Sequence, residues 1–544
     1  MALSPAAAVV PGQPARRRAW HWPTGLAWLL ALPLILPLVF LLVGAGDWRP
    51  DLWSHIARHL LPRAVFDTLV LALAIAVLTL IPGLGFAWAS ARYDYPGRRI
   101  FDWALVLPLA IPGYVVAFVY VGLLDYAGPV QTVWRDWFGP GASLPNGRGL
   151  PAAAVLLSLV LYPYVYLLAR AAFLRHGTAA LDAARSLGHG PVSGFLRAVL
   201  PLTRPAWVAG LTLAVLEALA DFGAVSILGV DTLTTTIYRV WFGMYSLPTA
   251  AQLALGLLTL VALVLLIERA ARGRARYAGA IGSAGTIRRR LIGWRGWSIT
   301  GLAAATVLFG FALPVVRLAT WAWQARERLP DVAQASANTL MLAAAATVLV
   351  LIGAIALVLL ARRRPGDHGI AVAGFVANLG YAVPGTVLAV AVMTMLVAAQ
   401  AGLVRIGGPS WPLSSSLIAV LLALSVRFMR VGHGAVESAF AALRPGILET
   451  ARLLEPSPWH RLREVIAPLL RPGLLAGALL LMVEVMKELP ATLMLRPFGW
   501  DTLAIRVYSH AAEGLWLEAA WPALILSLIG LAPVWWLVRR QDEN

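Results

Sequence analysis

The stretch that decides the fold occurs twice in the chain, as LDAARSLGHGPVSGFLRAVLPLTRPA (Leu181–Ala206) and as LETARLLEPSPWHRLREVIAPLLRPG (Leu448–Gly473). The two copies align without a gap, and the match continues into the apolar segment that follows each copy. Equivalent positions include Asp182 and Glu449, Arg204 and Arg471, Gly210 and Gly477, and Glu217 and Glu484. Such internal similarity indicates that two homologous halves were fused into one chain.

Fainter similarities extend the repeat over most of the sequence. They pair Ile111–Ala117 with Val383–Ala389, Asp67–Leu69 with Asn338–Leu340, and Asp231–Leu233 with Asp501–Leu503. We therefore expect two domains, residues 1–284 and residues 285–544, each with one copy of the loop (residues 181–206 and 448–473). The arginine- and glycine-rich stretch Ala271–Trp297 is expected to link them.

The composition places both halves in a membrane. Of the 544 residues, 60% are hydrophobic and 13% are charged, whereas soluble domains contain about 45–50% and about 25%. Apolar runs that approach the roughly 20 residues of a transmembrane helix extend from Leu26–Val43 to Ala519–Val538, and the tenth, Ser416–Phe428, is short and has Arg427 and Arg430 at its end. We predict an all-α polytopic protein with about twelve spans. Six spans in each half give both halves the same orientation, as in a parallel repeat.

The net charge of +18 follows from the expected membrane topology. If Arg16–Arg18 before the first span lie in the cytoplasm, most of the 44 Lys and Arg residues fall in cytoplasmic segments, as the positive-inside rule requires. Both termini are then cytoplasmic, in a bacterial inner membrane, and no nucleic-acid partner is needed to explain the charge. The first span is longer than the apolar core of a signal peptide, so we expect an uncleaved anchor.

Two residue types exclude whole classes of chemistry. Because the chain has no cysteine, it has no disulfide, iron–sulfur cluster, thiolate zinc site or cysteine nucleophile. The single lysine, Lys487, lies in the sequence MKELP with no glycine-rich loop before it, so the chain has no P-loop for ATP hydrolysis. We therefore expect that this chain is not an enzyme.

Both loop copies resemble the EAA loop of permeases of binding-protein-dependent ABC importers, in which E-A-A is followed by a glycine and then by I-x-L-P. The matching positions are Asp182, Ala183, Ala184, Gly188 and Pro201 in the first copy, and Glu449, Ala451, Glu455 (at the glycine position) and Pro468 in the second. The resemblance implies a type I importer permease fold in which the two loops dock into two copies of an ATPase subunit. ATP and Mg²⁺ would then bind to that subunit, and this chain would need no cofactor.

The second loop departs from the pattern at Glu455. Since Pro456 disfavours the α region at the residue before it, we expect the docking helix to end there all the same, but we expect the two docking sites to differ. Small residues such as Ala183 and Ala184 are expected to permit close approach of the partner. The alternative for both loops is an ordinary amphipathic segment lying on the membrane surface.

Longer stretches resemble one branch of this family, the fused permeases of ferric iron importers: Leu107–Gln131, Leu159–Phe173, Ala220–Met244 and Val485–Tyr508. The resemblance implies transport of Fe³⁺ delivered by a periplasmic or extracellular binding protein. Thiamine and phosphonate permeases share parts of these stretches, so either substrate is an alternative for the same machinery. An ion-coupled secondary transporter is an alternative of another class, and an integral membrane enzyme is a third.

Charged residues within two expected spans are the candidates for a translocation path. They are Glu217 and Asp221 in the fifth span, and Glu484, Lys487 and Glu488 in the eleventh. A charge at the centre of a span costs at least about 2.5–3.5 kcal/mol, so such residues usually face a partner or a watery path. One hypothesis is that the four carboxylates contact Fe³⁺ transiently, without a tight metal site. The alternative is structural: Lys487 pairs with Glu484 or Glu488, and the other carboxylates cap broken helices near Gly223 and Pro490.

Three further sets of residues predict local structure. Pro112-Gly113, Pro384-Gly385 and Pro490 mark kinks or breaks, since proline removes a helical hydrogen bond. Asp67 and Asn338, near the starts of spans, are expected to be N-caps. Tyr162, Tyr164 and Tyr166 are either packing aromatics or phenols directed at iron.

Overall fold

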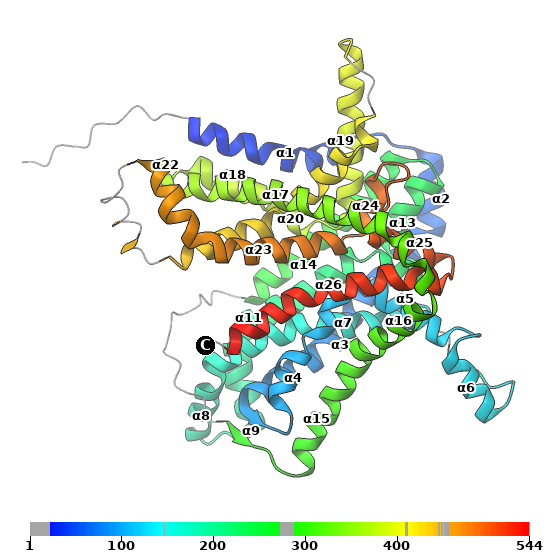
Figure 1. The fold of residues 1–544 in the computed structure, drawn as a ribbon, viewed down its shortest axis with the longest axis vertical. Coiled ribbons are helices and arrows are strands. Elements are labelled where there is room, and N and C mark those ends of the chain that lie inside the picture. The colour runs from blue at the N-terminus through cyan, green and yellow to red at the C-terminus, as the bar shows by residue number, and fades with distance from the viewer. Residues whose placement is uncertain are drawn as a thin grey trace, which may run out of the picture.

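The structure is a computed structural model that describes residues 22–542 apart from 146, 273–287, 409–411, 444–445, 448–449 and 451–456. Most of the described residues are helical, and the long helices lie side by side across the molecule (Figure 1). In this part of the chain eleven helices are long and apolar enough to cross a membrane, and one bent pair, Pro191–Leu202 with Arg204–Ala220, brings the number to twelve. The prediction of an all-α polytopic protein with about twelve spans is confirmed.

The two halves contain matching series of helices. The first half comprises α1 (Trp22–Gly44), α2 (Pro50–His59), α3 (Leu61–Arg92), α4 (Arg98–Ala104), α5 (Gly113–Leu124), α6 (Pro129–Phe138), α7 (Leu150–Ala172), α8 (Thr178–Ser186), α9 (Pro191–Gly194), α10 (Leu200–Leu202), α11 (Arg204–Ala220), α12 (Gly223–Ile227), α13 (Leu233–Tyr238) and α14 (Leu247–Arg272). The second comprises α15 (Trp294–Val307), α16 (Leu313–Gln324), α17 (Ala333–Arg363), α18 (His368–Ala377), α19 (Gly385–Arg405), α20 (Leu417–Ala441), α22 (Pro458–Arg461), α23 (Ala467–Lys487), α24 (Pro490–Leu495), α25 (Leu503–Ala512) and α26 (Trp516–Asp542).

The same hydrogen bond occurs once in each half. In the first half the backbone N–H of Leu233 donates to Thr68 Oγ1 over 2.9 Å, and in the second half the N–H of Leu503 donates to Thr339 Oγ1 over 2.8 Å. Each bond ties the start of a helix, α13 or α25, to the long helix α3 or α17. Since these are the residues that the sequence repeat pairs, the two halves fold alike at this point.

The expectation that Asp67 and Asn338 are N-caps is wrong. Helix α3 begins at Leu61 and helix α17 at Ala333, so both residues lie inside a helix. Both side chains are buried, and the Asn338 amide donates to the backbone carbonyl of Asp501 over 2.9 Å. Asn338 therefore ties α17 to the segment before α25, whereas Asp67 lies 3.6 Å from Arg63, one turn earlier in α3.

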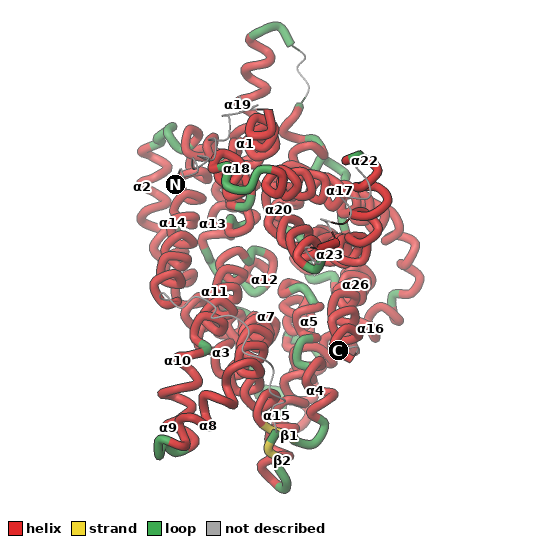
Figure 2. The backbone as a smooth tube through the Cα atoms, turned by 90° about the vertical axis from the view of Figure 1, so that its left-hand side faces the viewer, coloured by secondary structure: helices red, strands yellow, loops and turns green. Residues whose placement is uncertain are grey.

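The first span of each half packs against the other half. Helix α1 lies along α18 and α19, whereas α15 and α16 lie along α4 and α5 (Figures 1 and 2). Ala27 and Ala31 on α1 are fully buried and belong to the same continuous core as residues of both halves. The exchange of first spans therefore makes the two halves one packed body.

Four spans are interrupted where the sequence predicted kinks or breaks. Helices α5 and α19 begin directly after Pro112 and Pro384, each following a short helix and a 3-10 turn. Helices α11 and α23 end at Ala220 and Lys487, and each is followed by a short helix, α12 or α24. In a bundle without water, the backbone groups that a break frees must find partners inside the protein. The breaks therefore determine where polar side chains are needed.

The tenth span is longer than the sequence suggested. Helix α20 runs from Leu417 to Ala441, so Arg427 and Arg430 lie within the helix instead of at its end. The expected span stopped at Phe428, because the charges Arg427 and Arg430 mark the end of the apolar run. A helix continues through an arginine when its guanidinium finds a partner inside the bundle.

The expected boundary between the domains, at residues 284 and 285, falls outside the described residues. After it, β2 (Arg289–Arg290) pairs in parallel with β1 (Tyr93–Asp94), which directly follows α3. The start of the second half is thus attached to the first half before the span α15 begins.

Candidate translocation site

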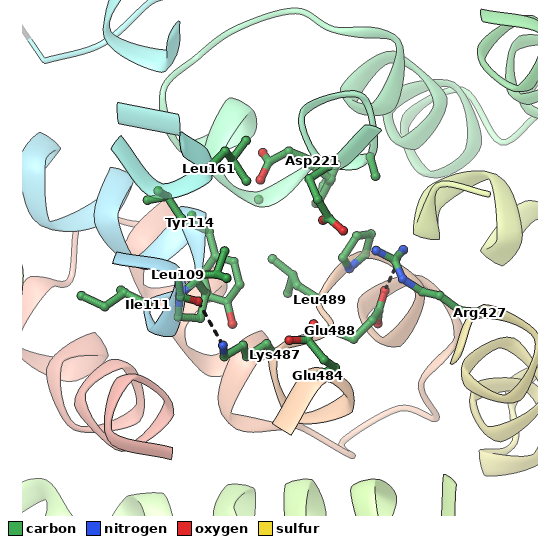
Figure 3. Close-up of a pocket in the computed structure, with 18 of the residues that line it drawn as sticks. Leu109, Ile111, Tyr114, Leu161, Asp221, Arg427, Glu484, Lys487, Glu488 and Leu489 are labelled. Carbon is green, nitrogen blue, oxygen red and sulfur yellow. Dashed lines mark hydrogen bonds and ion pairs between the residues drawn. The ribbon is translucent and has the colours of Figure 1, made fainter. Parts of the chain in front are cut away.

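A cavity of about 370 Å³ lies where the breaks of the two halves meet. Helices α5, α7, α11 and α12 contribute its lining from the first half, and α20, α23 and α24 from the second (Figure 3). The five residues that the sequence marked for a translocation path all line it: Glu217, Asp221, Glu484, Lys487 and Glu488. The repeat therefore brings both carboxylate pairs into one chamber between the halves.

Aliphatic and aromatic side chains form the rest of the chamber wall. They include Leu161, Leu480, Leu489, Tyr114, Tyr164 and Tyr381. Of the three tyrosines marked in the sequence, only Tyr164 is among these lining residues. The hydroxyls of Tyr162 and Tyr166 donate to the backbone carbonyls of Leu105 (2.6 Å) and Asp102 (3.0 Å). These two are packing residues, as one of the two interpretations proposed.

Glu488 caps the short helix α24. Its Oε1 accepts from the backbone N–H of Ala491 over 2.9 Å, and its Oε2 accepts from the N–H (3.0 Å) and the hydroxyl (2.7 Å) of Thr492. Arg427 Nη1 lies 3.8 Å from Glu488 Oε1. Only 6% of Glu488 is exposed, so this buried carboxylate is almost fully engaged by protein groups.

Asp221 plays the corresponding role in the first half. Its Oδ1 accepts from the backbone N–H of Val225 over 3.0 Å, at the start of α12. Asp221 is the repeat equivalent of Glu488. The structural alternative raised from the sequence, that these carboxylates cap broken helices, therefore describes both residues, although both also line the chamber.

Two Pro-Gly pairs let other helix starts approach these caps. A Cβ atom on Gly385, the first residue of α19, would lie 2.7 Å from Glu488 Oε1 and 2.6 Å from Arg427 Nη1. A Cβ on Gly113, the first residue of α5, would lie 3.5 Å from Asp221 Oδ2 and 3.0 Å from Leu157. Glycine is thus needed most at position 385, where a side chain would displace the capping carboxylate.

Glu217 and Glu484 differ from the two capping carboxylates. They are repeat equivalents one helical turn before Asp221 and Glu488, and both line the chamber. Within the described residues, neither has a hydrogen bond or an ion pair to another protein group. Their oxygens are therefore available to something that enters the chamber.

Lys487 does not form the ion pair that the structural alternative predicted. Its Nζ donates to the backbone carbonyl of Leu109 over 3.3 Å (Figure 3), and among the described residues no carboxylate lies within 4.0 Å of it. The carbonyl of Leu109 lies in the turn that precedes the break before α5. The lysine therefore ties the second half to the broken third span of the first half.

Arg427 is the charged lining residue that sequence reasoning missed. It extends from α20 towards Glu488 (Figure 3), and its Nη1 is buried without a hydrogen bond within the described structure. Its repeat equivalent in the first half is Val160, which also lines the chamber. The sequence could have revealed Arg427, because the repeat aligns its apolar stretch with a full-length span of the first half, which places the arginine inside the span.

In loop 181–206, the two small residues Ala183 and Ala184 differ in their exposure. Helix α8 ends at Ser186, and Gly188 has φ +83°, a left-handed conformation that favours glycine. Asp182 and Ala183 are exposed, but Ala184 is buried and packs against Gly194. The expectation that Ala184 permits close approach of a partner is wrong, because its methyl group fills the inside of the loop.

The most exposed apolar side chains of this loop lie outside the motif. Leu187 is 80% exposed and Val192 is 72% exposed, on either side of the Gly188 turn. Pro201 lies in the following short helix, α10. Leu187 and Val192 form an apolar tip on the loop. The sequence could have marked Leu187, because the second copy of the loop also has a leucine, Leu454, at the equivalent position.

The second copy of the motif is described only in part. Glu449, Ala451 and Glu455 lie outside the described residues. Pro468 lies in the first turn of α23, where the chain enters the span that leads to Glu484.

Residues 81–273 match the family model described as binding-protein-dependent transport system inner membrane component. Over 219 residues the chain is 31% identical to the probable sulfate transport system permease protein cysT of Chlorokybus atmophyticus, a match that covers 39% of this chain and 72% of that protein. The chain belongs to this family. It is a multi-pass inner-membrane permease of an ABC importer and not an enzyme, and ATP hydrolysis belongs to a separate subunit.

Two further relatives show how far the similarity extends. The permease is 24% identical over 534 residues to the Fe(3+)-transport system permease protein FbpB 2 of Haemophilus influenzae, which covers 96% of this chain and 98% of that protein. It is 34% identical over 152 residues to the molybdenum transport system permease protein ModB of Escherichia coli K12, covering 28% of this chain and 65% of that protein. The end-to-end match confirms the resemblance to a fused permease.

Glu488 and Glu484 lie one turn apart and provide a matched test of the two kinds of carboxylate. We expect Glu488→Gln to lower the free energy of unfolding by about 2 kcal/mol, since it removes a charge paired with Arg427 and one oxygen that caps α24. We expect Glu484→Gln to change it by less than about 0.5 kcal/mol. Unfolding of the purified permease in detergent, followed by tryptophan fluorescence, measures both, and equal effects would contradict the distinction.

Proposed function

We propose that this permease conducts ferric iron, which a substrate-binding protein delivers from the outer side of a bacterial inner membrane. The observation that carries the proposal is the composition of the chamber, where four carboxylates face two cationic side chains, Arg427 and Lys487. Hard cations take oxygen ligands, and an excess of carboxylates favours a cation over an anion in a site of low polarity.

The names of the similar proteins also favour a cation as the substrate. A relative that matches end to end is named for Fe(3+) transport, whereas the relatives reported above that are named for sulfate and molybdenum match parts of the chain. Sulfate, or the phosphonate considered from the sequence, would meet a net negative chamber. Thiamine, which is a cation, is the alternative substrate that charge alone does not disfavour.

The two uncommitted carboxylates are proposed to contact the ion. Glu217 and Glu484 come from equivalent positions of the two halves, line the chamber and make no hydrogen bond or ion pair within the described structure, whereas Asp221 and Glu488 cap the short helices that follow the breaks. Two carboxylates alone would coordinate the ion only transiently. This suits a conducting site, because such a site must release its ion. Among the described residues no group of three or more His, Asp or Glu side chains could hold a metal ion.

The orientation and the partners complete the proposal. We place both termini and both loop copies in the cytoplasm, where two copies of an ATPase subunit dock, one on each loop. ATP and Mg²⁺ bind to that subunit, and this chain requires no cofactor of its own. The exposed Leu187 and Val192 supply the apolar contact on loop 181–206, in the manner of interface anchors.

Uptake of radiolabelled ferric iron tests the substrate. In a strain with no other iron importer, we expect deletion of the permease to abolish energy-dependent uptake, and excess thiamine or aminoethylphosphonate to leave wild-type uptake unchanged. Uptake that persists after deletion would refute iron as the substrate and leave the permease assignment intact.

The same uptake measurement tests the two uncommitted carboxylates. We expect the double variant Glu217→Gln/Glu484→Gln to lower the rate about tenfold or more, the equivalent of about 1.4 kcal/mol in the barrier, while the protein level in the membrane stays the same. Glu268→Gln is the control, because Glu268 pairs with Arg272 at the end of α14, away from the chamber. Wild-type uptake in the double variant would exclude both residues from the path.

Copurification with the ATPase subunit tests the docking loop. We expect Leu187→Glu to abolish recovery of the ATPase with the tagged permease, since it puts a charge into an apolar contact worth about 2 kcal/mol or more. The control is Phe498→Glu, a fully exposed residue between α24 and α25. Undiminished recovery of the ATPase with Leu187→Glu would place the contact elsewhere.

A further inference from the structure

A second polar hollow lies away from the chamber, beside the turn between α3 and α4. It has a volume of about 680 Å³ and is lined by Asp94, Tyr95, Gly97, Arg98, Arg99, Ile100 and Arg288. Arg92, at the end of α3, is 3.4 Å from Asp182 of loop 181–206. The hollow is therefore at the same end of the molecule as the docking loop.

The carboxylates near this hollow already form ion pairs with arginines. Arg98 bonds Asp94 over 3.0 Å and Asp102 over 2.7 Å, and Arg170 also reaches Asp102 at 3.2 Å. Arg99 and Arg288 have no carboxylate within 4.0 Å among the described residues. The hollow thus presents two guanidinium groups whose counter-ion is not supplied by the described part of the chain.

Buried polar atoms at the hollow also lack partners. The Tyr95 hydroxyl and Arg288 Nε are buried and make no hydrogen bond within the described structure, and only 4% of Tyr95 is exposed. Burial raises the pKa of Tyr95, so its hydroxyl remains a donor. Burial and the neighbouring Arg98 lower the pKa of Arg288, as expected where positive charge is concentrated. Tyr95, Arg99 and Arg288 therefore line a space that suits an anionic oxygen ligand.

Exposed apolar side chains border the basic groups. Ile292 is 77% exposed and Trp294 is 76% exposed, and Trp297 and Ile100 are exposed as well. Trp294 is the first residue of the span that begins with α15. Tryptophan at the end of a span typically lies at the level of the lipid headgroups, and basic pockets at this level bind anionic headgroups.

The equivalent turn of the second half carries its basic residues before the Pro-Gly pair, as Arg362, Arg363 and Arg364. There Pro365-Gly366 is followed by Asp367 and His368, where the first half has Pro96-Gly97 followed by Arg98 and Arg99. Asp367 accepts from the backbone N–H groups of Gly369 (2.9 Å) and Ile370 (3.2 Å) and from the Thr24 hydroxyl (3.0 Å). Tyr95, Arg98 and Arg99 are thus replaced by Arg364, Asp367 and His368, which makes the two turns chemically different.

We propose that the hollow between the α3–α4 turn and the start of α15 binds the phosphate headgroup of one anionic phospholipid, with Arg99, Arg288 and Tyr95 as its donors. The acyl chains lie along the exposed residues Trp294 and Trp297. The bound lipid joins the start of the second half to the first half, beside the β1–β2 pairing (Figure 2). The choice of the cytoplasmic leaflet rests on the proposed orientation of the permease, but headgroup binding does not.

Native mass spectrometry of the purified full chain tests the site, with dioleoyl phosphatidylglycerol and dioleoyl phosphatidylcholine as probes. We expect one phosphatidylglycerol to be retained in preference to phosphatidylcholine. The variant Arg99→Gln/Arg288→Gln should weaken that binding by about 10- to 30-fold, from about 1 kcal/mol for each arginine. Arg362→Gln/Arg363→Gln, at the corresponding end of α17, should bind as the wild type does.

Three outcomes would overturn the proposal. Equal phosphatidylglycerol binding by the two double variants would remove the hollow as the site. Displacement of the lipid by millimolar inorganic phosphate would make it a site for the free anion. Wild-type lipid binding with loss of ATPase recovery in Arg99→Gln/Arg288→Gln would assign the arginines to the ATPase. If the glutamine variant does not fold, Arg99→Lys/Arg288→Lys keeps the charge and should retain the lipid. None of these measurements depends on iron transport.

Discussion

The structure depends on one constraint: helices that break inside an apolar bundle must have their freed backbone groups satisfied by the protein. Each unsatisfied group costs several kcal/mol where water is absent. The permease meets this constraint with a carboxylate in each half, Asp221 at α12 and Glu488 at α24. The need to pair and shield these carboxylates then fixes their neighbours, among them Arg427 and the glycine at position 385. The chamber exists because two capped breaks meet between the halves.

The fused halves share a scaffold but not their charges. Equivalent threonines, Thr68 and Thr339, hold equivalent helices, and both halves exchange their first spans. Yet both cations of the chamber, Arg427 and Lys487, come from the second half, where the first half has Val160 and Ala220. Fusion of the two halves permits this difference, since two copies of a single half would have to carry the same residue at both equivalent positions. The second half can then supply the cations that balance the carboxylates of the chamber, while the helices of both halves keep the same arrangement.

Sequence reasoning succeeded where one residue's role follows from local pattern and failed where it depends on distant partners. Composition and the repeat predicted the spans, the breaks at Pro112 and Pro384, and the residues of the chamber. Asp67 and Asn338 were misread because a polar residue near a span start looks the same whether it caps the helix or lies buried within it. Arg427 was missed because its partner, Glu488, is far away in sequence. The burial of Ala184 was missed because it depends on how the loop folds back after the Gly188 turn and brings Gly194 against it.

The division between capping and free carboxylates bears on how the permease can release its cargo. An ion that displaced Glu488 from its cap would have to compete with two backbone N–H groups, a hydroxyl and Arg427, and it would unmake α24. Glu217 and Glu484 make no hydrogen bond or ion pair within the described structure that an arriving ion would have to break. An ion coordinated by these two groups alone keeps most of its other ligands, so its binding stays weak. Weak binding is what conduction needs, so the proposed role of Glu217 and Glu484 depends on the other two carboxylates remaining occupied as caps.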